Sequence, residues 1–126
     1  MSKPEATLQA HIIKGYEARG AYVAKIHQTG RGRRGIPDVL ACYRGYYVAL
    51  EIKATTPVSD HQRRELHAIM GAGGIAAVVR SIEAAIGILD QIDALHDKEG
   101  VLGAMGQRVI VGHIPPANIV ELDAVA

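Results

Sequence analysis

Two acids and a lysine interrupt an otherwise apolar stretch, GIPDVLACYRGYYVALEIKA, which spans residues 35–54. The stretch predicts two β-strands joined by a short turn. Asp38 begins the first strand, and Glu51 and Lys53 lie inside the second. Charged side chains are unusual within a sheet, so these three residues are the first candidates for chemistry.

A two-residue turn at Arg44-Gly45 would set the register of this hairpin, because glycine accepts a positive φ. The predicted pairs are Tyr43 with Tyr46, Ala41 with Val48, Val39 with Leu50, and Asp38 with Glu51. Directly opposed residues have Cβ atoms about 4.5–5.5 Å apart, so two carboxylates there repel each other unless a positive charge lies between them.

A hard divalent cation is the simplest source of that charge. Mg²⁺ binds through one or two carboxylates and keeps several waters, which leaves positions for phosphate oxygens. Such an ion polarises a phosphoryl group and lowers the pKa of a bound water, which suits phosphodiester hydrolysis. Lys53 lies two residues beyond Glu51 on the same face, where it could orient or deprotonate that water or offset developing charge.

The surrounding elements alternate between helix and strand. Apolar residues at helical spacing predict a helix from Pro4 to Arg19, with Glu5 and Gln9 among its polar remainder. A strand, a loop rich in glycine and arginine and the hairpin follow; then come a helix over 59–74, a buried strand over 75–81 and a helix over 81–97. The order α-β-β-β-α-β-α predicts an α/β fold with a mixed sheet flanked by helices. Residues 1–97 are the expected core domain, and residues 98–126, with one strand-like run (RVIVGHI), are an expected appendage to it.

These residues resemble the PD-(D/E)xK nuclease superfamily, and most closely its VRR-NUC branch and the archaeal-type Holliday junction resolvases. The resemblance covers residues 5–90 and includes GIPDV after a basic loop, EIK, and the run HQRRELHAIMGAGG. It implies a restriction-endonuclease-like core in which Asp38, Glu51 and the Ile52 carbonyl hold Mg²⁺ or Mn²⁺. It also implies that Lys53 is the catalytic lysine, that Glu5 is a further acid near the metal, and that Gln62 is the glutamine of the following helix.

Basic residues gather near the same place in an otherwise nearly neutral chain of net charge +1. Four of the 14 lysines and arginines fall between residues 25 and 34, with no acid among them. We expect contacts with phosphates rather than base recognition. The candidate DNA-binding residues are Lys25, Arg31, Arg33, Arg34, Arg63 and Arg64.

Each candidate also has a purely structural interpretation. Asp38 is a common turn residue after proline, and Glu51 and Lys53 could lie on the outer face of an edge strand. Acids are favoured in the first turn of a helix, which would explain Glu5. Ser59 and Gln62 form a capping-box pattern, which would explain Gln62 without catalysis.

Composition excludes several other classes of protein. A length of 126 residues suits one domain, and a single cysteine excludes a disulfide framework and a cysteine zinc site. No apolar run is long enough to span a bilayer, and the N-terminal sequence lacks the apolar region of a secretory signal, so we expect a cytoplasmic protein without membrane contact or small-molecule cofactor. Six histidines show no metal-ligand spacing, although His27 could donate a proton to the leaving oxygen.

The sequence therefore predicts a Mg²⁺-dependent endonuclease that recognises DNA shape, with branched DNA such as a four-way junction as the most attractive substrate. A restriction- or repair-type nuclease acting on ordinary duplex, and a nucleic-acid-binding module without catalysis, remain as alternatives. By resemblance, we expect a homodimer of bacterial or phage origin.

Overall fold

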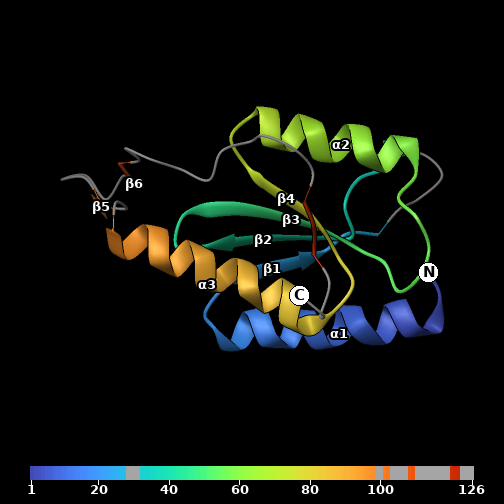
Figure 1. The fold of residues 1–126 in the computed structure, drawn as a ribbon, viewed down its shortest axis with the longest axis horizontal. Helices are drawn as coiled ribbons and strands as arrows, with labels where there is room; N and C mark the ends of the chain where they lie inside the picture. The colour runs from blue at the N-terminus through green and yellow to red at the C-terminus, as the bar shows by residue number, and fades with distance from the viewer. Residues whose placement is uncertain (28–31, 99–100, 103–107, 110–119, 123–126) are drawn as a thin grey trace.

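A central sheet separates two layers of helices in the computed structural model (Figure 1). The structure describes residues 1–27, 32–98, 101–102, 108–109 and 120–122. In chain order the core elements are α1 (Lys3–Ala18), β1 (Tyr22–Lys25), β2 (Val39–Tyr43), β3 (Tyr46–Ile52), α2 (Asp60–Gly71), β4 (Ile75–Val79) and α3 (Ile82–Lys98). This order confirms the predicted α-β-β-β-α-β-α core.

The sheet is mixed, as predicted. Its strand order is β1-β2-β3-β4-β7, where β7 is Val120–Leu122. β2 is antiparallel to both β1 and β3, whereas β4 runs parallel to β3 and β7 runs parallel to β4. Two short strands, β5 (Val101–Leu102) and β6 (Arg108–Val109), form a separate pair; the rest of the predicted RVIVGHI strand lies outside the described residues. The division at residue 97 stays a prediction.

The hairpin has the predicted register. Tyr43 pairs with Tyr46, Ala41 with Val48, and Val39 with Leu50. Arg44 and Gly45 have φ values of 50° and 84°, and two positive values in a two-residue loop are those of a type I′ turn. Asp38 is the residue before this ladder, and its carbonyl accepts a 2.9 Å hydrogen bond from the Ile26 amide of the neighbouring strand segment. The register therefore places Asp38 beside Glu51.

Apolar side chains fill both sides of the sheet. α1 and α3 cover one face, where Ile12, Leu50, Ile52 and Leu89 are fully buried or nearly so. On this side the apolar stripe along α3, which includes Ile88 and Ile92, is part of the core. α2 covers the other face through a smaller cluster, in which Leu66 packs with Met70, Ala76 and Val78. No helix among the described residues is both long and apolar enough to cross a membrane.

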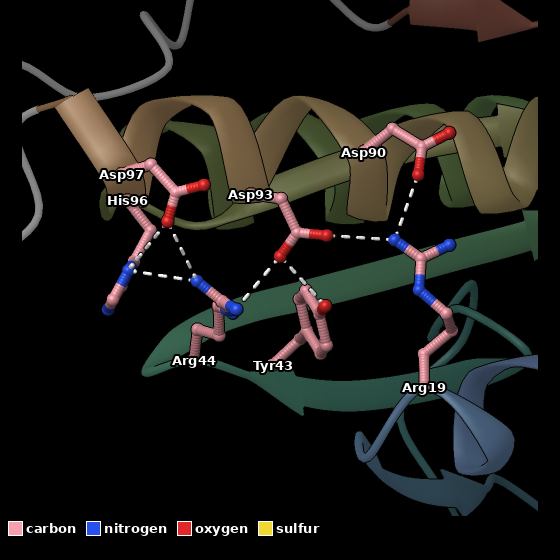
Figure 2. Close-up of polar contacts among 7 residues, drawn as sticks. All are labelled: Arg19, Tyr43, Arg44, Asp90, Asp93, His96 and Asp97. Atoms are coloured by element: carbon pink, nitrogen blue, oxygen red, sulfur yellow. Dashed lines mark hydrogen bonds and ion pairs between the residues drawn. The ribbon is translucent and has the colours of Figure 1, made fainter.

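The turn end of the hairpin is fastened to α3 by Asp93 (Figure 2). Its Oδ1 accepts a 2.8 Å hydrogen bond from the Tyr43 hydroxyl and lies 3.0 Å from Arg44 Nε. Its Oδ2 accepts a 2.8 Å bond from Arg19, at the end of α1. Partial burial acts to raise the pKa of Asp93, but the Tyr43 hydroxyl and the two guanidinium groups outweigh it and hold that pKa below its usual value. Asp93 thus joins α1, α3 and the hairpin.

Asp93→Ala should lower the free energy of unfolding by about 1–3 kcal/mol, because it removes an acceptor that three side chains share. Asp90→Ala is the matched control, since within the described residues Asp90 pairs with Arg19 alone and its side chain is 65% exposed; it should cost less than about 1 kcal/mol. Urea unfolding of both variants measures the difference. Equal losses would mean that Asp93 does not join the three elements.

Candidate active site

Glu51 is the most enclosed charged residue of the described chain, with 2% of its surface exposed. Its Oε1 accepts a 2.7 Å hydrogen bond from Gln62 Nε2 and lies 3.9 Å from Lys53 Nζ. Its Oε2 is buried and has no hydrogen-bond partner among the described residues. The Lys53 side chain is 14% exposed. The alternative in which Glu51 and Lys53 lie on the outer face of an edge strand is therefore wrong, because β3 lies between β2 and β4 in the sheet.

Asp38 is held at the end of the same strand. Its Oδ2 accepts a 2.8 Å hydrogen bond from the Ile52 amide, two residues beyond Leu50, which is the last residue of β3 paired with β2. The Asp38 carboxylate thus accepts the hydrogen bond of a β3 amide that lies beyond the last pair with β2 and would otherwise have no backbone partner on that side. A turn role alone does not account for this bond, since it reaches across to the strand that carries Glu51.

The two carboxyl groups disturb each other's ionisation. Burial, followed by the charge of Asp38, raises the pKa of Glu51 to about 9, and Lys53 offsets this only in part. Burial also raises the pKa of Asp38, although the hydrogen bonds to the Ile52 amide and to the Glu51 carboxyl group, and then the charge of Lys53, act in the opposite direction. The protein by itself supplies too little positive charge to keep both groups ionised at neutral pH.

A divalent cation fits these residues. Oε2 of Glu51 is buried, and no N–H or hydroxyl group of the described residues donates to it. Glu51 is hydrogen-bonded to the Asp38 carboxyl group, and its raised pKa means that the two share a proton when no cation is bound. A divalent cation could replace that proton and be bound by both carboxylates. No group of three or more His, Cys, Asp or Glu side chains within the described ranges is arranged as a complete metal cage. Two carboxylates are nevertheless the usual protein share of a Mg²⁺ site, in which waters and substrate oxygens fill the remaining positions.

Gln62 serves the cap and the carboxylate at once. Its Oε1 accepts a 2.9 Å bond from the Ser59 amide, and the Ser59 hydroxyl accepts from the Gln62 amide at 3.2 Å, which completes the predicted capping box. The other end of the same side chain donates to Glu51. The two interpretations of Gln62 are therefore compatible, and the helix cap fixes the amide that orients the Glu51 carboxylate.

Glu5 lies near this group but is bound to the backbone that follows it. It is 8% exposed, and its Oε1 accepts bonds of 3.4 Å from the Ala54 amide and 3.3 Å from the Thr56 hydroxyl. Both α1 and α2 begin at the end of the sheet where β3 ends (Figure 1). Glu5 thus ties the start of α1 to the segment that joins β3 to α2.

Gln9 belongs to the polar remainder of its helix, yet it is buried. Only 2% of Gln9 is exposed, and its Oε1 is buried with no hydrogen-bond partner in the described part of the chain. The sequence spacing is consistent with this burial, because Glu5, Gln9, Ile12 and Tyr16 recur along one face of α1 and all four are buried. The polarity of the Gln9 side chain alone suggests an exposed position.

The basic candidates are dispersed around the site. Arg33, Arg34, Arg63 and Arg64 are exposed, and Arg31 lies outside the described residues. Arg33 Nε lies 3.2 Å from Glu65 Oε2 on α2, and Arg64 lies 2.9 Å from His61 Nδ1. Lys25 is exposed too, but it pairs with Val39, whose side chain enters the α1–α3 core, so Lys25 faces the side of the sheet opposite Glu51.

Gly35 brings the basic loop against α2. It has a φ of 81°, and a Cβ atom added there would lie 2.4 Å from the His61 carbonyl carbon and oxygen and 2.7 Å from the Gln62 amide nitrogen. No other residue type fits without moving the helix backbone. Arg33 and Arg34 are therefore held beside the first turn of α2, which carries Gln62.

Comparison with known proteins found structural relatives. No protein-family model matches the chain, and no curated protein matches it. Two solved structures match, both with a TM-score of 0.60. A "VRR_NUC domain" is 28% identical, and the match covers 71% of this chain and 97% of that chain. A "VRR_NUC domain protein" is 17% identical over 72% of this chain and 88% of that chain, a likeness of fold alone.

In the metal-free protein, Glu51→Gln should be more stable than the wild type, and increasingly so from about pH 4.5 to about pH 9. The folded state holds the Glu51 proton with a pKa of about 9 and the unfolded chain with a value near 4.5, so the wild type loses stability as pH rises through this window. The difference should widen by up to ~1.4 kcal/mol per pH unit.

Urea unfolding in EDTA at several pH values measures this effect. Glu83→Gln, an exposed position on α3, is the control and should follow the wild type at every pH. A constant difference between Glu51→Gln and the wild type across the window would contradict the raised pKa.

Proposed function

Because its solved structural relatives support its assignment as a VRR-NUC domain, a nuclease-type domain, we propose that this protein is a divalent-metal-dependent endonuclease that hydrolyses DNA. The observation that carries the proposal is the buried Glu51 carboxyl group, which has one unpartnered oxygen beside Asp38 and a lysine 3.9 Å from the other oxygen. A binding module gains nothing from two adjacent carboxylates, because they repel phosphate.

In the proposed site, Asp38, Glu51 and the Ile52 carbonyl hold Mg²⁺ or Mn²⁺. When bound, the ion supplies Lewis acidity to the scissile phosphate and lowers the pKa of an attacking water. Gln62 keeps one oxygen of Glu51 in place through its 2.7 Å hydrogen bond, which leaves Oε2 for the ion. Glu5 holds the chain that follows Lys53, and so acts as a positioning residue in this scheme.

Lys53 is proposed to be the catalytic cation. Its side chain is 14% exposed, so its ammonium group is reachable from solvent but partly desolvated. There the ammonium group offsets the charge that develops on the phosphate, or the side chain, as the neutral amine, accepts a proton from the attacking water. Arg33 and Arg34, which the Gly35 contact holds beside α2, are proposed to bind backbone phosphates next to the cut site.

DNA rather than RNA, a branched rather than a plain duplex substrate, a homodimeric assembly and a cytoplasmic location in a bacterial or phage-infected cell are further parts of the proposal. A basic loop on a small chain suits recognition of backbone shape more than recognition of sequence. Action on ordinary duplex, as in restriction or repair, is the alternative enzyme.

Glu51→Gln and Lys53→Ala should each reduce cleavage by about 10²-fold or more, since each removes a group that acts on the transition state. DNA binding should remain within a few fold. Single-turnover cleavage with Mg²⁺ or Mn²⁺, alongside binding in EDTA, measures both effects. Glu83→Gln and Lys14→Ala change exposed charges of the same kind and serve as controls. Undiminished cutting by either site variant would refute the mechanism.

A synthetic four-way junction should be cut in preference to a linear duplex of the same sequence, and EDTA should abolish cutting of both. Parallel incubations with Mg²⁺, Mn²⁺, Ca²⁺ or EDTA, resolved on denaturing gels, measure this preference. Equal cutting of the two substrates would keep the active site and reject the branched substrate. Binding without cutting under every metal, even with protein in excess, would favour the binding module.

A further inference from the structure

The five tyrosines divide into a buried set and an exposed set. Tyr16, Tyr43 and Tyr46 are at most 6% exposed, and the hydroxyls of the first two bind Ala85 and Asp93. Tyr22 and Tyr47 are 73% and 47% exposed. The chain contains no phenylalanine or tryptophan, so these two are its exposed aromatic rings apart from histidine. Packing explains the buried set and leaves the exposed set without a role.

Both exposed rings lie on the face of the sheet that carries Glu51. Tyr22 pairs with Cys42, and Cys42 pairs with Tyr47, so the three side chains form one row across β1, β2 and β3. Cys42 is exposed as well. Alternation along β3 places Tyr47 on the same side as Glu51, four residues away. At ~3.3 Å per residue, the row lies about 13 Å from the carboxylates.

The Arg33 side chain and an open pocket lie next to Tyr47 in this row. An open pocket of about 500 Å³ is lined by Tyr47, by Arg33 and by Ile69 of α2. The Arg33 side chain is 71% exposed and pairs with Glu65, which is 19% exposed, so much of the guanidinium group is open to a phosphate. Tyr47 thus lies beside Arg33 of the proposed phosphate-binding loop.

We propose that Tyr22 and Tyr47 form a stacking platform for unpaired bases of a single-stranded nucleic acid segment that extends from the carboxylate site. The inference deepens the proposed function, on which it rests. Exposed aromatic rings beside a cation are the elements by which proteins hold single strands without reading sequence. A separation of about 13 Å corresponds to about four nucleotides at the ~3.4 Å spacing of stacked bases. Among branched substrates, the platform therefore favours DNA with an unpaired arm next to the cut over a fully paired four-way junction.

A second copy of the chain is the less favoured occupant of this face. The next row inward is Ala24, Leu40 and Ala49, and Ala49 is fully buried. The exposed apolar surface therefore narrows within two residues of the tyrosines, whereas a stable interface buries about 800 Å² on each partner. Arg33 at the border suits an anionic partner.

Binding of a labelled oligothymidylate in EDTA, where nothing is cut, tests the platform directly. The double variant Tyr22→Ala/Tyr47→Ala should bind at least about tenfold more weakly than the wild type, because stacking on each ring contributes about 1–3 kcal/mol by alanine substitution. Tyr22→Phe/Tyr47→Phe should bind normally, since phenylalanine keeps the ring. Cys42→Ser, between the two rings, is the matched control and should change affinity less than twofold. Because there is no tryptophan, stacking should also quench the tyrosine emission of the wild type.

The outcomes separate this inference from the proposed function. Unchanged oligothymidylate affinity in the alanine variant, with circular dichroism confirming its fold, would overturn the platform whether or not the protein cuts DNA. An equal loss of affinity for fully paired duplex would overturn its preference for single strands. A loss of self-association in sedimentation without a loss of oligonucleotide affinity would assign the face to a second copy. Ring-dependent binding in a protein that never cuts would keep the platform and reject the nuclease.

Discussion

Glu51 lies near the end of β3 with 2% of its surface exposed, beside the carboxyl group of Asp38. If Glu51 is ionised, its negative charge has to be balanced by groups of the protein or by a bound cation. The protein contributes one lysine at 3.9 Å and one amide donor at 2.7 Å. Since these leave one oxygen of Glu51 without a partner, the fold maintains a site that is favourable for a cation and unfavourable for a second free carboxylate.

The rest of the architecture keeps that site in place from several directions. α2 begins with a cap whose glutamine also contacts Glu51, α1 begins with an acid that binds the segment after Lys53, and Gly35 lets the basic loop touch α2. At the other end of the hairpin, Asp93 fastens the turn to α3 (Figure 2). The hairpin is thus anchored to α3 at its turn, and its open end holds the candidate site residues Asp38 and Glu51.

The hairpin shows why part of this was predictable. Its register follows from local rules, because a two-residue turn with glycine and strict alternation fix which side chains oppose one another. The same rules placed Asp38 beside Glu51 and completed the capping box at Ser59. Gln9 shows the limit: a polar residue on a helix is assigned to the surface unless its spacing is weighed against the buried positions around it.

The element order, the hairpin register and the choice of the acidic pair and its lysine as candidates follow from the sequence, because each depends on patterns within a few tens of residues. The folded structure adds the depth at which Glu51 is buried, the double role of Gln62 at the cap and the carboxylate, and the bonds from Glu5 to Ala54 and Thr56. It also separated the two exposed tyrosines from the three buried ones. Burial and cross-element contacts depend on how distant segments pack, and side-chain chemistry along the chain does not encode that packing locally.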